Sequence, residues 1–204
     1  MTINSKSIFA HRGFWANSYA QNSIDSFEAA ARNGFSIETD LRSFNGALVI
    51  SHDPISGDRY VELGDLIRLN STFALNVKED GLQSKILEIR EWIKSSNSFV
   101  FDGSLPEMFR YKKLGIEHAL RISEYERELA WDCKFVWLDS FESDWWIDDM
   151  SVIEYLQGRE VVVVSPELHG RDHKSLWSYL HESRQKGRFD FSICTDLPLE
   201  FAAW

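Results

Sequence analysis

Short apolar or β-branched segments alternate along the chain with segments of helical period, and no other feature of the sequence limits its fold so strongly. This alternation is typical of parallel strands joined by crossover helices. The candidate strands lie at residues 8–11, 36–41, 74–77, 99–101, 119–122, 135–138, 161–164 and 192–194. Eight such strands predict an α/β fold that closes into a (β/α)8 TIM-type barrel.

The helical segments are fewer and shorter than an eight-stranded barrel usually carries. Apolar residues recur at helical spacing around residues 24–31, 82–93, 106–114, 152–158 and 174–186. Barrels of this type typically need ~250 residues, and ~200 is the lower bound. Because the chain has 204 residues, we expect one compact barrel domain over residues 1–204. Some of its helices should be short or missing, notably between residues 101 and 135.

Residues 47–52 form a further apolar run that does not fit the count of barrel strands. The run follows Asn45-Gly46, a dipeptide that favours a tight hairpin turn. We therefore expect a hairpin extension of the second strand, which would bring His52 back over the mouth of the barrel.

Composition excludes several classes of protein. The chain carries 22 Lys and Arg against 32 Asp and Glu, a formal net charge of −10, and has no basic cluster, so nucleic-acid binding is not expected. Cys133 and Cys194 are too few for a disulfide framework and read as free, buried thiols. The polar start lacks the apolar region of a secretory signal, and no apolar run approaches the ~20 residues that span a bilayer. These features favour a cytoplasmic location, and they carry no signal for an oligomeric state.

Polar side chains follow the predicted strands, at the ends where barrel enzymes keep their active sites. They are His11, Arg12, Glu38, Asp40, Asn76, Lys78, Asp102, Arg121, Asp139, Glu167 and Asp196. Glu38 and Asp40 are two residues apart on one strand and therefore point to the same face. Two acids that face one point repel each other unless a cation lies between them, and hard oxygen ligands suit Mg²⁺ or Ca²⁺.

His11 and His52 would approach this cation from separate loops. Their reference pKa near ~6.5 allows one to act as a general base and the other as a general acid. Arg12 and Lys78 add positive charge that suits binding of a phosphate. Together these residues match the needs of phosphodiester cleavage, which requires an activated oxygen nucleophile, stabilised charge on the phosphoryl oxygens and a protonated leaving group.

Each of these residues also has a structural interpretation. A single histidine after a strand is more often structural than catalytic, and Glu38 with Asp40 can form a solvated strand edge. Lys78 can extend its stem over apolar surface, and the aspartates at the strand ends can cap helices. Only the joint spacing of the residues favours a catalytic site.

Four motifs together resemble the glycerophosphodiester phosphodiesterase family, within the phospholipase-C-like phosphodiesterases. They are residues 8–14 (IFAHRGF), 21–27 (QNSIDSF), 37–42 (IETDLR) and 49–54 (VISHDP), and residues 193–198 (ICTDLP) are similar to the family's closing strand. The resemblance implies a barrel in which His11 and His52 are the acid–base pair and Glu38 and Asp40 bind a divalent cation. It also implies that a hydroxyl of the substrate's own glycerol attacks phosphorus, giving a cyclic phosphate that water can open.

The chain departs from the family pattern at two positions. Gln21 stands where the family usually has Glu. Asn76 stands where the family usually has a third metal-ligating Glu, two residues before its strand lysine, here Lys78. Because Asn offers a carbonyl oxygen without a charge, we expect weaker metal binding or a further ligand from Glu167 or Asp102.

These features favour a metal-dependent phosphodiester hydrolase that acts on a small glycerophosphodiester or a related ester, as in lipid metabolism. Asn76 and Gln21 motivate one alternative, a non-catalytic barrel that binds phosphorylated ligands. A lyase that stops at the cyclic phosphate is a second alternative. No Gly-x-Gly-x-x-Gly or Walker-type loop occurs, so neither an oxidoreductase nor a nucleotide-binding machine is expected.

Overall fold

The strands of the barrel wall follow the predicted order. The computed structural model describes residues 4–15, 19–57, 60–188 and 190–204. Within them the wall consists of β1 (Ile8–His11), β2 (Ser36–Phe44), β5 (Phe73–Val77), β6 (Phe99–Phe101), β7 (Ala119–Ile122), β8 (Phe135–Leu138), β9 (Glu160–Val164) and β10 (Ser192–Thr195). All eight predicted strands are therefore confirmed, four of them with the predicted bounds. The polar start of the chain lies partly outside the described residues, since residues 1–3 are not among them.

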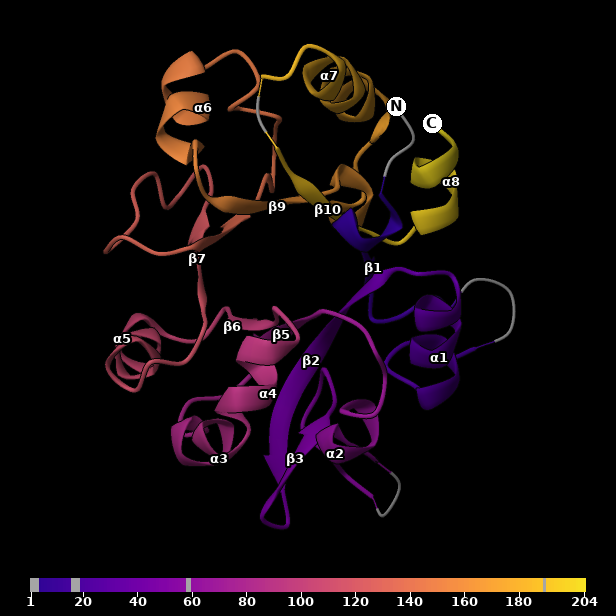
Figure 1. The fold of residues 1–204 in the computed structure, drawn as a ribbon, viewed down its shortest axis with the longest axis vertical. Coiled ribbons are helices and arrows are strands. Elements are labelled where there is room, and N and C mark those ends of the chain that lie inside the picture. The colour runs from indigo at the N-terminus through magenta and orange to yellow at the C-terminus, as the bar shows by residue number, and fades with distance from the viewer. Residues whose placement is uncertain (1–3, 16–18, 58–59, 189) are drawn as a thin grey trace.

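The wall is a ring of parallel strands. The pairing runs from β1 through β2, β5 and β6, and from β7 through β8, β9 and β10 back to β1. Between β6 and β7 there is one isolated parallel bridge, from Val100 to His118, and the Val100 N–H donates to Glu117 O at 3.1 Å. We call this junction the β6–β7 seam. Figure 1 shows β2, β5 and β6 in one half of the molecule and β7, β9 and β10 in the other, with β1 between them. The (β/α)8 barrel is thus present, with one weak junction.

The predicted hairpin is also present. β2 continues past the wall and pairs in antiparallel register with β3 (Ala47–Ile50), and β3 pairs with the short β4 (Val61–Glu62). Asn45 and Gly46 form the turn, with φ values of 47° and 86°, which explains why this dipeptide occurs there. The hairpin returns the chain to the level of Asp40, because the Ser51 N–H donates to Asp40 O at 3.1 Å.

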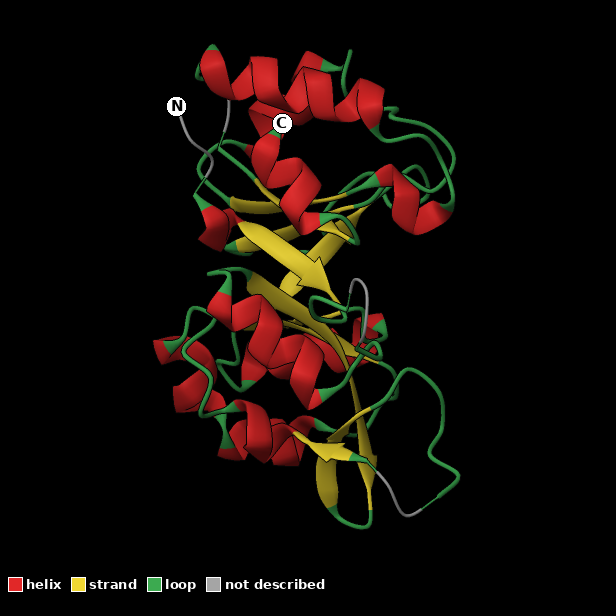
Figure 2. Cartoon of the chain, turned by 90° about the vertical axis from the view of Figure 1, so that its right-hand side faces the viewer, coloured by secondary structure: helices red, strands yellow, loops and turns green. Residues whose placement is uncertain are grey.

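Helices lie outside the strands (Figure 2). They are α1 (Ile24–Arg32), α2 (Leu63–Leu66), α3 (Gln83–Glu88), α4 (Arg90–Ser95), α5 (Leu105–Lys113), α6 (Met150–Leu156), α7 (Lys174–Gln185) and α8 (Pro198–Ala203), with 3-10 helices η1 (Ser5–Ser7) and η2 (Pro166–His169). In the described part of the chain no helix joins β7 to β8, as expected from the short sequence there. The apolar stripe at residues 82–93 forms two helices, because Ile89 leaves helical geometry with φ −103° and ψ 10°.

The alternation of each strand separates an inner from an outer face, and paired residues on neighbouring strands share a face. The outer face packs beneath the helices. The inner face forms a separate apolar cluster of Phe9, Ala74, Phe99, Phe101, Ala119, Phe135, Trp137, Val162, Val164 and Cys194. β2 contributes nothing to that cluster, since its inner positions include Glu38 and Asp40, which pair with Ala74 and Asn76. Each of the two acids is 1% exposed, so the interpretation of Glu38 and Asp40 as a solvated strand edge is wrong.

No helix of the described residues is both long and apolar enough to cross a membrane. Cys133 and Cys194 are both free thiols, as predicted. Cys194 is buried, as expected, whereas Cys133 is only half-buried.

Candidate active site

His11 is the last residue of β1 and lies between two carboxylates. Its Nδ1 is 2.8 Å from Asp196 Oδ1, and its Nε2 is 3.8 Å from Glu38 Oε2. Burial lowers the pKa of His11, but the hydrogen bond to Asp196 and the charge of Glu38 outweigh burial and leave that pKa raised. A carboxylate accepts an N–H, so Asp196 selects the tautomer protonated at Nδ1 and leaves Nε2 of the neutral ring as the proton acceptor.

The loop after β1 holds Arg12 against the second buried carboxylate. Arg12 and Gly13 have φ values of 55° and 85°, so the chain turns sharply where the strand ends. Asn22, later in the loop, donates its N–H to Arg12 O at 2.9 Å and its Nδ2 to Asp40 Oδ2 at 2.8 Å. Arg12 Nε then lies 3.0 Å from Asp40 Oδ2. The loop ends at Ser23, which caps α1.

Asp40 lies between two cationic side chains. In addition to Arg12, Lys78 Nζ lies 3.1 Å from Asp40 Oδ1. Gln21 Oε1 accepts a hydrogen bond from Arg12 Nη1 at 3.2 Å, so this amide binds the guanidinium without adding a charge. The Arg12 and Lys78 side chains are each 22% exposed, and a phosphate could therefore reach both.

The pKa of the buried Glu38 carboxyl is strongly perturbed. Burial raises the pKa of Glu38 to about 7, against the lowering effects of His11 and of the Arg12 N–H, which donates to Glu38 Oε2 at 3.2 Å. The charge of Asp40 raises that pKa further. Positive charge close to such a carboxyl would favour its ionised form, and this environment is compatible with a bound cation.

Glu38, Asp40 and Asn76 offer the oxygen donors that a hard cation prefers. Asp40 and Asn76 pair in register on β2 and β5. Asn76 Oδ1 is buried and has no hydrogen-bond partner among the described residues, and Asp40 Oδ1 has only its ion pair with Lys78 there. No three His, Cys, Asp or Glu side chains in the described ranges are grouped so that they could hold a metal. The third oxygen donor beside Glu38 and Asp40 is the Asn76 amide. The donors fit Mg²⁺ or Ca²⁺ with one neutral ligand.

The two acids expected as replacements for the third ligand are bound elsewhere. Glu167 accepts hydrogen bonds from the Thr195 hydroxyl and, at 3.2 Å, from the Asp196 N–H. Asp102 pairs with Arg121, whose Nε donates to Asp102 Oδ1 at 3.1 Å. The aspartates at the strand ends do not cap the helices that follow, whose caps are Ser104, Asp149 and Leu197.

His52 lies at the same end of the sheet, but its hydrogen bonds are with Arg42 and Asp53, outside the group of site residues. Arg42 donates from Nε and Nη2 to His52 O at 3.1 and 2.9 Å. The His52 Nδ1 lies 2.9 Å from Oδ1 of the adjacent Asp53, and the His52 side chain is 47% exposed. Within the described residues, no hydrogen bond or ion pair joins this imidazole to the other predicted site residues. The structure thus brings together His11, Arg12, Glu38, Asp40, Asn76 and Lys78 and leaves the His52 ring at their edge.

Sequence reasoning missed one histidine of the barrel mouth, His169. This residue ends η2, and its Nε2 lies 2.7 Å from Asp139 Oδ1. Asp139 and Arg121 were recognisable as polar residues at strand ends, but no local pattern marks a histidine in the loop after β9. A contact between residues 30 positions apart becomes visible only when the barrel is formed.

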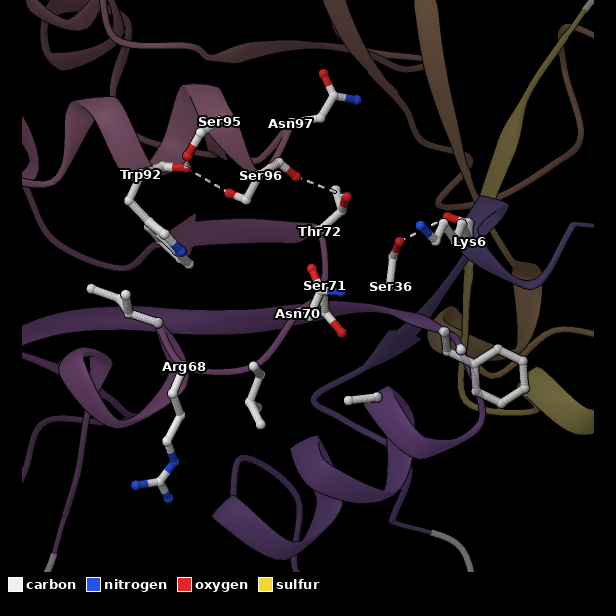
Figure 3. A pocket seen from close by; sticks show the side chains of 15 residues that line it. Lys6, Ser36, Arg68, Asn70, Ser71, Thr72, Trp92, Ser95, Ser96 and Asn97 are labelled. Atoms are coloured by element: carbon white, nitrogen blue, oxygen red, sulfur yellow. Dashed lines mark hydrogen bonds between the residues drawn. The ribbon is translucent and has the colours of Figure 1, made fainter.

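A cavity of about 530 Å³ lies at the opposite end of the barrel, at the amino ends of β2, β5 and β6 (Figure 3). Two hydroxyl groups that line this cavity donate hydrogen bonds to backbone carbonyl oxygens. Ser36 Oγ donates to Lys6 O at 2.7 Å, and Thr72 Oγ1 donates to Ser96 O at 2.9 Å. These bonds join loops at the end of a barrel that serves stability, so this cavity is not part of the candidate site.

Comparison with solved structures supports the fold. No protein-family profile and no curated protein matches the chain. A protein from Silicibacter pomeroyi DSS-3, named as a candidate glycerophosphoryl diester phosphodiesterase, superposes with a TM-score of 0.64 at 11% identity, over 95% of this chain and 91% of that one. A glycerophosphoryl diester phosphodiesterase from Parabacteroides distasonis ATCC 8503 has a TM-score of 0.56 at 15% identity, over 96% of this chain and 84% of that one. The shared feature is the fold.

Proposed function

We propose that this chain is a phosphodiester hydrolase that acts on a small diester such as a glycerophosphodiester. One observation carries the proposal. An imidazole oriented by a carboxylate, two buried carboxylates and two cationic side chains meet at the carboxyl ends of β1, β2 and β5. The names of the two proteins with the same fold support the same reaction class.

In the proposed reaction, His11 removes a proton from the attacking hydroxyl. We assign the base role to His11 because the Asp196 contact leaves its Nε2 free to accept a proton. The hydroxyl oxygen of the substrate's glycerol bonds to phosphorus, and the bond from phosphorus to the second alcohol breaks. His52 gives a proton to the departing oxygen, which requires its exposed ring to turn toward the phosphate. The cyclic phosphate is then opened by water.

The charged residues around His11 would stabilise the phosphate. Arg12 and Lys78 place positive charge where negative charge develops on the phosphoryl oxygens. Glu38, Asp40 and Asn76 would hold a divalent cation, which supplies Lewis-acid stabilisation of the same charge.

The test is turnover of a glycerophosphodiester with Mg²⁺ or Ca²⁺, followed by phosphorus NMR. We expect a phosphate monoester as the product. His11→Ala and His52→Ala should each lower kcat by about 10²–10⁴-fold, the range for loss of an acid–base group. Asp40→Asn should lower kcat by a similar factor in a folded protein. His181→Ala is the control, because His181 lies on the outer helix α7, where its Nε2 bonds to Gln185. Absence of turnover with any divalent cation, or full activity of His52→Ala, would contradict the proposal.

Measurements on the same protein distinguish two other functions from the hydrolase. A non-catalytic phosphate-binding barrel is favoured by the uncharged Asn76 and Gln21, and it would bind glycerol phosphate in calorimetry without metal and without turnover. A lyase would release the cyclic phosphate as its final product, which has its own phosphorus resonance.

A further inference from the structure

The half of the barrel mouth built by β7, β8 and η2 carries a second histidine–carboxylate pair. His169 Nε2 lies 2.7 Å from Asp139 Oδ1, and the same oxygen accepts the Ser140 N–H at 2.9 Å. Asp139 is 4% exposed, whereas the His169 side chain is 24% exposed. A buried carboxylate therefore orients a partly accessible imidazole, as Asp196 orients His11 across the mouth.

This second pair faces the same interior as the proposed catalytic residues. Arg121 pairs in register with Trp137, an inner-face residue, and Asp139 follows Trp137 by two positions. Burial is the largest cause of the raised pKa of the Cys194 thiol. The charges of acids from both groups, Glu38, Asp196, Glu167 and Asp139, raise this pKa further. Glu38 pairs in register with the inner-face residue Ala74, so Asp139 and Glu38 point into the same interior.

The side chains beside His169 combine a hydrogen-bond acceptor, a donor and an aromatic face. If the His169 Nε2–H is donated to Asp139, Nδ1 is left as an acceptor. Among the described residues, Arg121 uses Nε and Nη2 to bind Asp102, which leaves Nη1 as a donor to a ligand. The Phe141 ring is next to both side chains, since its centroid is 4.8 Å from that of the His169 ring and 5.4 Å from the Arg121 guanidinium carbon.

This combination selects among the alcohols that a phosphodiester can carry. A hydroxyl group can satisfy an imidazole acceptor and a guanidinium donor together, and the C–H face of a polyol can pack on an aromatic ring. An alkyl group of the same length would leave the polar groups unpaired, which a site built for hydroxyls rejects strongly. A second anionic group would meet Asp102, Asp139 and Glu126, which surround Arg121.

We propose that His169, Arg121 and Phe141 bind the alcohol that leaves phosphorus, that Asp139 positions His169, and that this alcohol is a polyol. The inference rests on the proposed hydrolase function and adds the chemical class of the alcohol that the reaction releases.

The test compares two diesters of glycerol 3-phosphate, one with glycerol and one with 1-propanol as the second alcohol. The two alcohols have the same carbon chain and differ only in hydroxyl groups. We expect kcat/KM for the glycerol diester to exceed that for the propyl diester at least tenfold. His169→Phe and Phe141→Leu should each reduce this ratio at least fivefold, while circular dichroism verifies that both variants are folded.

The matched control is His181→Phe, the same change on the outer face of α7, which should leave the ratio unchanged. Absence of turnover of either diester would refute the proposed function itself. Turnover of both diesters with equal kcat/KM, or a ratio unaffected in folded His169→Phe and Phe141→Leu, would overturn the polyol subsite and leave the hydrolase proposal in place.

Discussion

Asn76 is the residue at which the candidate site differs most from a fully charged metal site. It faces Asp40 across β2 and β5, and its Oδ1 is buried without a hydrogen-bond partner among the described residues. Aspartate has nearly the same shape and adds a third carboxylate. We therefore expect Asn76→Asp to lower the Kd for Mg²⁺ or Ca²⁺ about tenfold or more, equivalent to about 1.4 kcal/mol. Titration calorimetry measures this change directly.

The same variant should be less stable without metal, because three carboxylates then face one point. Added Ca²⁺ should raise its Tm by more than that of the unsubstituted protein, since a ligand stabilises the state that binds it. Asn70→Asp, at the amino end of the barrel, adds the same charge away from the site and should leave the Kd unchanged. An unaltered Kd in Asn76→Asp would show that Asn76 is not a ligand.

Among the elements, the turn after β1 depends on Gly13. This residue has φ +85°, and a Cβ there would lie 2.9 Å from the backbone carbonyl carbon of Ser26 in α1. Gly13→Ala therefore combines backbone strain with overlap, and we expect it to lower the free energy of unfolding by about 2–3 kcal/mol. Urea denaturation measures this loss.

A substitution at Gly46, in the hairpin turn, tests backbone strain without steric overlap. Its φ is +86°, but a Cβ there meets nothing within 4 Å. Gly46→Ala should cost only the strain, about 1 kcal/mol. Equal losses in the two variants would show that α1 moves away from Gly13 at little cost.

A carboxylate in the loop between β7 and β8, where the described chain has no helix, binds the loop that follows β8. Glu124 accepts the backbone N–H groups of Phe141, Glu142 and Ser143 at 3.1, 3.0 and 3.1 Å. Partial burial raises the pKa of Glu124, but these N–H donors outweigh burial and leave that pKa lowered. The loop before β8 thereby fixes the loop after it, which carries Phe141.

Because the folded-state pKa of Glu124 is depressed, the stability it contributes is present above the unfolded pKa of about 4.3 and is lost as pH falls through the folded pKa. We expect Glu124→Gln to be less stable than the unsubstituted protein at pH 7, and this difference to shrink as the pH falls below about 4. Denaturant titrations over that range give the difference. A constant difference at all pH values would mean that the charge of Glu124 does not matter.

At the scale of the molecule, the parts of the fold that could be predicted from the sequence are those set by local patterns, and the parts that could not are those set by contacts between distant segments. Strands such as β6 and β8 are apolar runs that end in polar residues, and the spacing of Glu38 and Asp40 fixes their shared face without reference to the rest of the fold. The seam between β6 and β7, the break at Ile89 and the His169–Asp139 contact depend on how distant segments meet. No pattern within a short stretch of sequence shows which distant segments will meet.

The β6–β7 seam should be the place where the barrel opens first. One isolated bridge, from Val100 to His118, crosses the seam, whereas β9 pairs with β8 at four residues and with β10 at three. We expect the Val100 amide to exchange with deuterium at least tenfold faster than the most protected amides of β9, because local opening breaks fewest contacts there. Exchange measured by NMR under native conditions gives both rates, and equal protection would mean that the ring opens only as a whole.

The seam also coincides with a boundary along the chain. The segment that ends with α5 carries β1, β2, β5 and β6, and the segment after α5 carries β7, β8, β9 and β10 (Figure 1). A cut in the loop between α5 and β7 therefore leaves two contiguous half-barrels. The β1–β10 ladder, in which Ile8 pairs with Ile193 and Ala10 with Thr195, and the apolar cluster inside the barrel still join these halves. We therefore expect the two fragments to complement each other as separately expressed polypeptides.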